Sequence, residues 1–240
     1  MKVVILAGGR GTRMSEVTSV IPKPMVEVAG KPLLWYIMNI YSSYGFNEFI
    51  LAVGYKKEKI EEYFADSKNN KLNWKVSIVD VNINRNTGTG GAIREVADYI
   101  DGDEFMMTYG DGVADINLDA LLKFHRGHGR LATITAVKMP RFGIVTVEND
   151  GRVSAFQEKN LEHSPLINGG FMVLSKKVID YIDGPETAFE TTPMEKLCRD
   201  GELYAYVHKG FWKAVDSLRD KMDLEAVLTD KDNKVKLWKT

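Results

Sequence analysis

The chain has 240 residues, of which 44% are hydrophobic and 27% are charged, a composition that is ordinary for a globular enzyme. Its formal net charge of −1 leaves no basic field that would hold nucleic acid or an anionic membrane surface. A single cysteine, Cys198, excludes an internal disulfide and a cysteine-based metal cluster. No apolar stretch reaches the length of a membrane span and the N-terminus lacks a signal-peptide pattern, so we expect a cytoplasmic protein.

Strand-like and helix-like segments alternate through the first half of the chain. In chain order, strands are predicted at residues 1–7, 49–53, 76–81 and 104–109, and helices at 31–45, 57–64 and 90–100. This βαβα alternation predicts a Rossmann-like α/β fold, in which a mixed, mainly parallel sheet is flanked by helices on both faces.

The pattern changes in the second half, where shorter strands follow one another across polar turns. Strands are predicted at 131–138, 144–148, 152–157, 170–174 and 203–207, and helices at 176–182, 192–199 and 218–228. The consecutive strands predict a small antiparallel extension of the sheet. We expect a single domain in three parts, residues 1–130, residues 131–216, and a C-terminal helix and tail at 217–240. The charged tail from residue 229 is typical of an interaction arm or a frayed end.

A glycine-rich loop follows the first predicted strand. Residues 8–13 read Gly-Gly-Arg-Gly-Thr-Arg, and Pro22-Lys23-Pro24 comes nine residues later. Glycine has no Cβ, so the backbone N–H groups of such a loop can close on anionic oxygens, while Arg13 and Lys23 add positive charge. An isolated glycine pair would favour an ordinary strand-to-helix turn, but the two cations favour a phosphate-binding loop.

Two better-known phosphate loops do not fit this spacing. A dinucleotide fingerprint needs a third glycine where Met14 stands, and a P-loop needs Gly-Lys-Ser/Thr where the chain has Gly11-Thr12-Arg13. The missing third glycine disfavours a nicotinamide-dependent oxidoreductase.

Asp111 lies between two glycines, directly after the strand predicted at 104–109. Ligands of open parallel sheets gather beyond the carboxyl ends of the strands, so this carboxylate is expected to face the ligand crevice. A carboxylate beside a triphosphate needs a cation between them, and Mg²⁺ is bound by one or two carboxylates together with phosphate oxygens and water. The alternative is that Asp111 only forms a Gly-Asp-Gly turn.

The spacing G-G-x-G-T-R followed by P-K-P resembles the signature of the sugar-phosphate nucleotidyltransferases. Over nearly its whole length the chain is most similar to the glucose-1-phosphate cytidylyltransferase branch. The resemblance implies a GT-A-like fold whose residues 1–130 bind the nucleotide and whose residues 131–216 bind the acceptor. It also implies an Mg²⁺-dependent, homo-oligomeric enzyme of sugar-nucleotide and polysaccharide biosynthesis. Such an enzyme transfers CMP from CTP to glucose 1-phosphate or another sugar 1-phosphate and releases pyrophosphate.

The resemblance to the cytidylyltransferase branch depends on the Tyr-Gly-Asp-Gly-Val-Ala-Asp segment at 109–115 and on the Phe211-Trp212 segment. In the family the latter reads Phe-Trp-x-x-x-Asp-x-x-Arg-Asp, which implies that Asp216 is the second magnesium ligand. From the residues alone, Asp216 is equally suited to cap the helix that follows. Asp220 is expected to be structural.

Three further segments are implied to bind the acceptor. Phe-Gln-Glu-Lys at 156–159 matches the family's F-x-E-K-P, in which the lysine holds the acceptor phosphate and the glutamate holds sugar hydroxyls, although Asn160 replaces the proline. Residues 168–171, Asn-Gly-Gly-Phe, resemble the segment that lines the sugar pocket, and residues 141–143 resemble the family's R-F-G.

By analogy, Thr89-Gly90-Gly91 at the start of a predicted helix contacts the base or ribose, since a helix N-terminus offers free N–H groups. The full set implied by the resemblance comprises catalytic Arg13, Lys23, Asp111 and Lys159; metal ligands Asp111 and Asp216; nucleotide-binding Leu6, Ala7, Gly8, Gly9, Gly11, Thr12, Arg13, Lys23, Thr89, Gly90, Gly110 and Asp111; and acceptor-binding Arg141, Gly143, Glu158, Lys159, Asn168 and Gly169.

These residues imply in-line attack by an acceptor phosphate oxygen on the α-phosphorus of the nucleotide. A phosphate monoester has a second pKa of about 6, so the nucleophile is already a dianion at neutral pH and needs no general base. None of the four histidines is assigned a catalytic role. His125 and His128 are expected on a partly exposed helix face.

Other substrates and one other class stay open at this stage. Two features depart from the cytidylyltransferase branch: Asn160 replaces a proline, and the segment at 68–87 is shorter. Because of these departures, a non-sugar phosphate or a phosphoramidate stays as an alternative acceptor. Cytosine and uracil differ by one donor–acceptor swap, so UTP or dTTP are alternatives to CTP. A non-catalytic nucleotide-binding regulatory domain is the alternative from another class, but it would need neither a metal pair nor an acceptor lysine such as Lys159.

Overall fold

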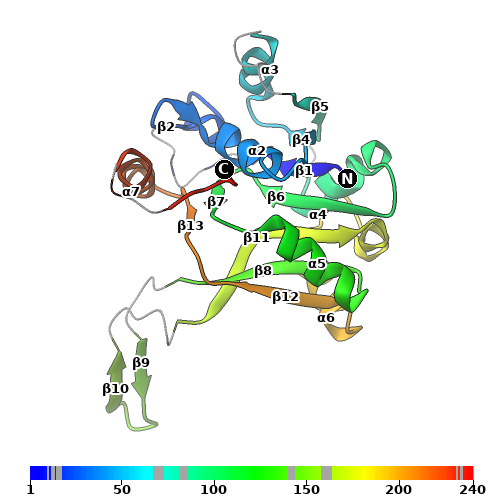
Figure 1. Cartoon of the computed structure of the whole chain (residues 1–240). Helices are drawn as coiled ribbons and strands as arrows, with labels where there is room; N and C mark the ends of the chain where they lie inside the picture. The colour runs from blue at the N-terminus through cyan, green and yellow to red at the C-terminus, as the bar shows by residue number, and fades with distance from the viewer. Residues whose placement is uncertain are drawn as a thin grey trace.

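A seven-stranded sheet forms the centre of the structure. The structure is a computed structural model, and it describes residues 1–9, 11, 14, 18–66, 73–81, 86–139, 144–157, 164–230, 232 and 235–239. The strands follow the order β12-β8-β11-β6-β1-β4-β5 across the sheet (Figure 1), with bounds Val3–Leu6 for β1, Glu48–Val53 for β4, Lys75–Asp80 for β5, Glu104–Tyr109 for β6, Ala132–Lys138 for β8, Leu166–Ser175 for β11 and Leu203–His208 for β12. β11 runs antiparallel to both of its neighbours, and all other pairs are parallel. The predicted mixed, mainly parallel sheet is therefore confirmed.

Helices cover both faces of this sheet, as predicted. Successive side chains of a strand point to opposite faces, and in β1 all of Val3, Val4 and Ile5 are fully buried. Val3 and Ile5 belong to one hydrophobic core and Val4 to a second core on the other face. The first core includes side chains of α2 (Leu33–Ser42), α3 (Lys57–Ala65), α5 (Leu118–His128) and α7 (Leu218–Thr229), and the second includes side chains of α4 (Thr89–Glu95) and α6 (Thr192–Arg199).

The carboxyl ends of β1 and β6 lie side by side at one edge of the sheet. The two strands are parallel and in register, from Val3 opposite Met106 to Leu6 opposite Tyr109. The glycine-rich loop after β1 and the Gly110-Asp111-Gly112 turn after β6 therefore emerge next to each other. This edge is where open parallel sheets bind their ligands.

Three short antiparallel pairs lie outside the central sheet: β2 (Glu27–Val28) with β3 (Lys31–Pro32), β7 (Gly112–Ala114) with β13 (Trp212–Ala214), and β9 (Ile144–Val147) with β10 (Val153–Gln157). The β9–β10 hairpin projects from the body of the protein (Figure 1). The sequence analysis predicts β9 and β10 but neither β7 nor β13. A strand of three residues is too short to show an alternating pattern.

Two predicted helices differ from the observed ones. The segment predicted at 176–182 forms a 3₁₀ helix, η5 (Lys176–Tyr181), rather than an α-helix. The helix predicted at 90–100 ends at Glu95 and is followed by a second 3₁₀ helix, η4 (Ala97–Tyr99). Both segments connect larger elements, where the tighter i→i+3 pattern is common.

The C-terminal tail packs against α2, which corrects the expectation of an arm or a frayed end. Leu237 is only 3% exposed. The ring of Trp238 lies edge-on to Trp35 and stacks on Tyr36, with centroids 5.9 and 6.3 Å apart. Leu237 thus belongs to the first core, and Val235 and Trp238 pack against it.

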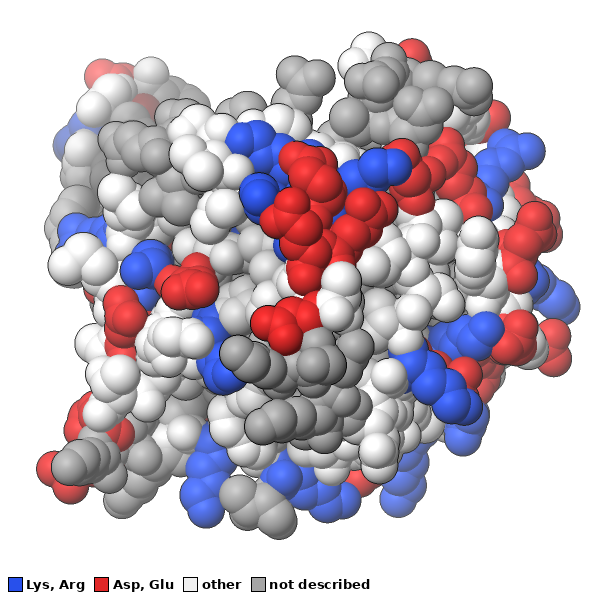
Figure 2. All heavy atoms as spheres, turned by 90° about the horizontal axis from the view of Figure 1, so that it is seen from above, with Lys and Arg blue, Asp and Glu red and all other residues white. Residues whose placement is uncertain are grey.

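None of the described helices is long and apolar enough to cross a membrane. Figure 2 shows that basic and acidic side chains are interspersed on the face seen from above, where one dense acidic group is flanked by basic side chains. Among the residues described on that face, the basic side chains do not join into one continuous surface.

Replacement of Leu237 by alanine is expected to lower the free energy of unfolding by about 2–3 kcal/mol, because a buried leucine loses its contacts. Urea unfolding followed by circular dichroism measures the change. Lys236→Ala, at an exposed neighbouring position, is the matched control and should leave the midpoint unchanged. Equal midpoints for the two variants would mean that the tail does not pack in solution.

Candidate active site

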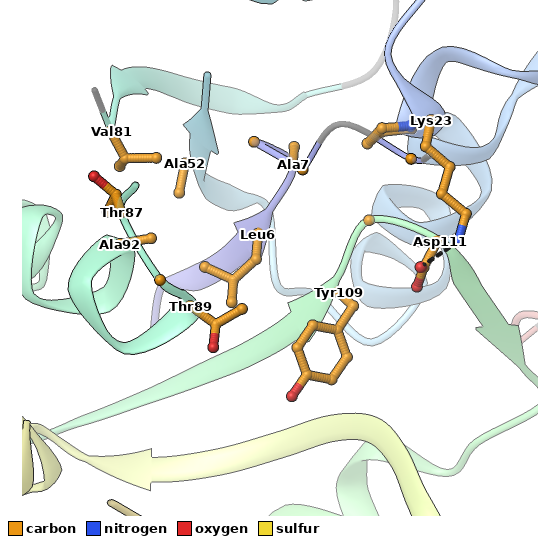
Figure 3. Close-up of a pocket in the computed structure, with 16 residues that line it drawn as sticks. Leu6, Ala7, Lys23, Ala52, Val81, Thr87, Thr89, Ala92, Tyr109 and Asp111 are labelled. Carbon is orange, nitrogen blue, oxygen red and sulfur yellow. Dashed lines mark hydrogen bonds and ion pairs between the residues drawn. The ribbon is translucent and has the colours of Figure 1, made fainter. Parts of the chain in front are cut away.

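A pocket of about 330 Å³ opens at the carboxyl ends of β1, β4 and β6 (Figure 3). Many of the residues predicted to bind the nucleotide meet there. The lining consists of Leu6, Ala7, Gly8, Gly9, Gly11, Lys23, Pro24, Ala52, Val81, Thr87, Gly88, Thr89, Ala92, Tyr109, Gly110 and Asp111. Thr12 and Arg13 lie outside the described residues.

Gly110 allows the two strand ends to approach this closely. Its N–H donates to the carbonyl of Leu6 at 3.0 Å. A Cβ at Gly110 would lie 2.7 Å from Cγ of Pro24 and 3.1 Å from the Leu6 carbonyl oxygen, which are distances that real Cβ atoms do not tolerate without a shift. A side chain here would push the turn that carries Asp111 away from Pro24 and from the end of β1.

Lys23 stands between the two carboxylates that were predicted to bind a metal. Its Nζ lies 2.7 Å from Oδ2 of Asp111 and 2.6 Å from Oδ1 of Asp216, and its side chain is only 11% exposed. The contact with Asp111 is visible in Figure 3. Lys23 begins a short 3₁₀ helix, η2 (Lys23–Met25), and Pro22 and Pro24 restrict the backbone on both sides of it. The ammonium offsets the repulsion between two neighbouring carboxylates.

The β7–β13 pair brings Asp111 and Asp216 together from distant parts of the chain. Gly112 pairs with Ala214, and the N–H of Val215 donates to the carbonyl of Asp111 at 2.9 Å. Asp111 directly precedes Gly112, which pairs with β13, and Asp216 directly follows Val215, which donates to the Asp111 carbonyl. The sequence shows no signal for this pairing apart from the family resemblance.

Asp216 does not cap α7, because Ser217 is the N-cap residue. Asp220 instead holds the start of this helix: its Oδ2 accepts hydrogen bonds from the Asp216 N–H at 3.2 Å and from the Ser217 hydroxyl at 2.7 Å, and its Oδ1 lies 2.8 Å from Nζ of Lys213. Burial alone would raise the pKa of Asp220, but the bonds from Lys213 and Ser217 outweigh it and lower the pKa. Asp220 is structural, as expected, and it orients the backbone of Asp216.

A second pocket of about 250 Å³ adjoins the first and shares Tyr109 and Asp111 with it. Its lining comprises Thr108, Tyr109, Asp111, Gly112, Asn168, Gly169, Gly170, Trp212, Ala214 and Asp216. Asn168 and Gly169, both predicted to bind the acceptor, are among these residues. Arg141, Gly143, Glu158 and Lys159 lie outside the described residues.

An irregularity in β11 shapes this second pocket. Asn168 pairs with Ala136 of β8, but Met172 pairs with Ile134, so β11 carries extra residues between two matched positions. The bulge directs the Asn168-Gly169-Gly170 backbone toward the pocket, and the indole N–H of Trp212 donates to the carbonyl of Gly169 at 2.7 Å. The glycines in this segment are needed for close approach, since a Cβ at Gly169 would lie 2.9 Å from Cγ1 of Val137.

The residues at the junction of the two pockets fit the ligand chemistry of a magnesium site. Two carboxylates converge on one point, and that point already holds a cation, the Lys23 ammonium. Mg²⁺ is bound by one or two carboxylates and completes its octahedron with phosphate oxygens and water. Among the described residues, no group of three or more His, Cys, Asp and Glu residues could hold a metal by itself.

The N–H groups expected to be free at the start of α4 are occupied by another part of the chain. Gly90 and Gly91 donate to the carbonyl of Thr187 at 2.9 and 3.2 Å, and Gly88 donates to the carbonyl of Pro185 at 2.9 Å. A Cβ at Gly91 would lie 1.8 Å from the Pro185 carbonyl oxygen. Gly90 and Gly91 therefore accommodate a backbone segment and do not line the pocket, whereas Gly88 and Thr89 do.

The two histidines of α5 have a structural role, and His125 is buried rather than partly exposed. Its Nδ1 and the Nε2 of His128 both lie within hydrogen-bond distance of the Thr133 hydroxyl, at 2.8 and 2.7 Å. Burial lowers the pKa of both imidazoles, so they are neutral at pH 7. Neither histidine lines one of the two pockets.

Several further pocket residues stand where the rule for ligand edges of parallel sheets would place them. Tyr109, Ala52 and Val81 stand at or just beyond the carboxyl ends of β6, β4 and β5, where ligands of parallel sheets gather. Trp212 reaches the second pocket through β13, which the sequence does not reveal.

A family model described as "Nucleotidyl transferase" matches residues 2–231. The chain belongs to this family. The nucleotidyl transferase is 45% identical over 259 residues to a probable glucose-1-phosphate cytidylyltransferase of Bacillus subtilis, and the alignment covers 99% of this chain and 100% of the relative. It is 46% identical over 248 residues to the glucose-1-phosphate cytidylyltransferase of Salmonella typhi, with 95% of each chain covered.

The fold of this nucleotidyl transferase is also similar to a solved structure. HddC from Yersinia pseudotuberculosis superimposes with a TM-score of 0.75 at 30% sequence identity, over 95% of this chain and 99% of that one. The family membership and the GT-A-like fold implied by the sequence resemblance are therefore confirmed.

Replacement of Asp220 by alanine is expected to lower nucleotidyl transfer about tenfold and stability by about 1 kcal/mol, because Asp216 loses its backbone contact and α7 loses a cap partner. Steady-state rates and thermal melting measure the two effects. Asp223→Ala is the matched control, since Asp223 contacts Lys213 at 3.0 Å but does not touch Asp216 or Ser217 in the described contacts. A loss of rate as large in the control would exclude the orienting role of Asp220.

Proposed function

We propose that this nucleotidyl transferase is an Mg²⁺-dependent cytidylyltransferase, which transfers CMP from CTP to a sugar 1-phosphate, with glucose 1-phosphate as the leading candidate. The observation that carries the proposal is the pair of adjoining pockets that meet at Asp111, with Lys23 and Asp216 at the junction. The relatives named for glucose-1-phosphate cytidylyl transfer, at 45% and 46% identity over nearly the whole chain, support the choice of substrates.

In the proposed reaction, CTP occupies the first pocket and the acceptor occupies the second. A phosphate oxygen of the acceptor attacks the α-phosphorus of CTP, a new P–O bond forms, and the bond between the α-phosphorus and the bridging oxygen breaks so that pyrophosphate leaves with its electron pair. The attacking phosphate is a dianion at neutral pH, because its second pKa is about 6, and no proton has to be removed from it. Catalysis then depends on position and charge.

Lys23 supplies positive charge where phosphate oxygens of both substrates would meet. Its side chain is mostly buried at the junction of the pockets, so its charge is less screened than that of a surface lysine. Asp111 and Asp216 would hold Mg²⁺, which would supply positive charge to neutralise phosphate oxygens. Arg13 and Lys159 extend the proposal to residues outside the described part of the chain.

The first pocket suits a nucleotide in the chemistry of its walls. Leu6, Ala7, Ala52, Val81 and Ala92 form an apolar floor on which a base and ribose can pack, and the glycines leave the backbone accessible to phosphate oxygens. This lining does not distinguish cytosine from uracil or thymine, so UTP and dTTP stay as alternative nucleotides. A cytoplasmic location and a homo-oligomeric state are part of the same proposal.

The proposal is tested by measuring pyrophosphate release with each of CTP, UTP, dTTP, ATP and GTP against a panel of phosphorylated acceptors. We expect the fastest release with CTP and glucose 1-phosphate. A higher kcat/KM with a non-sugar phosphate or a phosphoramidate would replace the acceptor. If pyrophosphate is released with none of the acceptors although a nucleotide binds tightly, the regulatory domain is favoured instead.

Replacement of Lys23 by alanine is expected to lower kcat by about 10²–10³, the usual scale for the loss of one charge-stabilising donor. Lys57→Ala is the matched control, because Lys57 also forms a 2.6 Å ion pair with an aspartate, Asp80, but does not line the pocket. Stopped-flow detection of pyrophosphate gives the rates of both variants. Near-normal turnover of Lys23→Ala would remove this residue from the catalytic set.

A further inference from the structure

Glu190 joins two residues of the first pocket that come from different elements. One carboxylate oxygen accepts a hydrogen bond from the hydroxyl of Tyr109 at the end of β6, and the other accepts one from the hydroxyl of Thr89 at the start of α4. The Thr89 hydroxyl in turn accepts a hydrogen bond from the N–H of Phe189 at 2.8 Å. Hydrogen bonds to a charged acceptor are among the stronger ones in proteins.

The ring of Tyr109 is also fixed along its side. Gly170 has φ +87°, and a Cβ there would lie 2.8 Å from Cδ2 of the tyrosine, so the ring packs directly on the glycine backbone. A phenol is protonated at neutral pH, so the Tyr109 hydroxyl is a hydrogen-bond donor to Glu190.

Tyr109 lies at the boundary between the two pockets. It lines both of them, and it precedes Asp111 by two residues. In Figure 3 its ring points away from Ala7 and Lys23, and the Tyr109 and Thr89 side chains extend toward the same side of the pocket. A rotation of this ring would change the shape of both pockets at the place where the two substrates have to meet.

The carboxylate of Glu190 is not needed to hold its own segment in place. The backbone before it is already attached to α4 through the hydrogen bonds from Gly88, Gly90 and Gly91 to Pro185 and Thr187. Glu190 itself is exposed, so its carboxylate would be well solvated without the two hydroxyls. The contact therefore acts on Tyr109 and Thr89 rather than on the fold of residues 184–190.

We propose that Glu190 is a positioning residue that fixes Tyr109 as the wall between the nucleotide pocket and the acceptor pocket, and so sets the affinity for the acceptor. This inference rests on the proposed function, since it names the acceptor pocket of that same site. Glu190 touches neither substrate in this assignment and acts through the tyrosine.

Glu190→Ala is expected to raise KM for the sugar 1-phosphate about tenfold, the scale of one lost hydrogen bond to a charged group, with kcat lowered less than about threefold. KM for CTP should change by less than about threefold, because Thr89 keeps its bond from Phe189. Glu190→Gln retains an acceptor for Tyr109 and a polar partner for Thr89, and it should restore KM to within about threefold of the wild type.

Tyr109→Phe removes the other half of the same contact and should raise KM for the acceptor by a similar factor. In the double variant the two effects should not multiply, because each change breaks the same hydrogen bond. Glu186→Ala is the matched control, as it removes an exposed glutamate from the same segment. An acceptor KM within twofold of wild type in Glu190→Ala, multiplying losses in the double variant, or an equal effect of Glu186→Ala overturns the inference.

The hydrogen bond between Tyr109 and Glu190 can also be measured without an activity assay. This measurement separates the inference from the proposed function. With tyrosine labelled at Cζ, the NMR signal that disappears in Tyr109→Phe identifies Tyr109. At neutral pH its Cζ chemical shift should change in Glu190→Ala, because the hydroxyl loses its hydrogen-bond acceptor, and should stay as in the wild type in Glu186→Ala. An unchanged shift in Glu190→Ala overturns the inference even if no acceptor is turned over, whereas a wild type that releases no pyrophosphate contradicts only the proposed function.

Discussion

One ammonium group between two carboxylates is the interaction on which the rest of the site depends. Asp111 and Asp216 are brought together by the β7–β13 pair, and without a cation between them their charges would repel. Lys23 supplies that cation from a segment held by two prolines. Under the proposed function, an Mg²⁺ ion held by both carboxylates would compete with the Lys23 ammonium for the same oxygens.

The two pockets have different origins in the fold. The first pocket lies in the parallel half of the sheet, at the carboxyl ends of β1, β4 and β6. The second depends on the antiparallel strand β11 and on its bulge, together with Trp212 from β13. Asp111 and Tyr109 belong to both, because β6 is the strand at which the parallel and antiparallel parts of the sheet meet.

The parts of the site that follow from local rules were predictable, and those that depend on distant contacts were not. A glycine-rich loop and an aspartate at the carboxyl ends of buried strands indicate a ligand edge from the sequence alone. Asp216 could be assigned only through the family resemblance, since a three-residue strand leaves no periodic pattern. The N–H groups of Gly90 and Gly91 were expected to be free because nothing in the local sequence shows that Thr187 accepts from them. For the same reason, neither the bridge formed by Glu190 nor the packing of Trp238 on Tyr36 was foreseen.

The long separation of the residues at the junction also has a consequence for how the enzyme becomes active. Lys23 and Asp216 are 193 residues apart in the chain, so their contact closes a loop that contains most of the protein. Contacts of such separation are costly to form early in folding, and during synthesis Asp216 emerges long after Lys23. Asp216 reaches Lys23 only when the two distant segments have both folded onto the sheet. Activity that needs both carboxylates would therefore report this late contact.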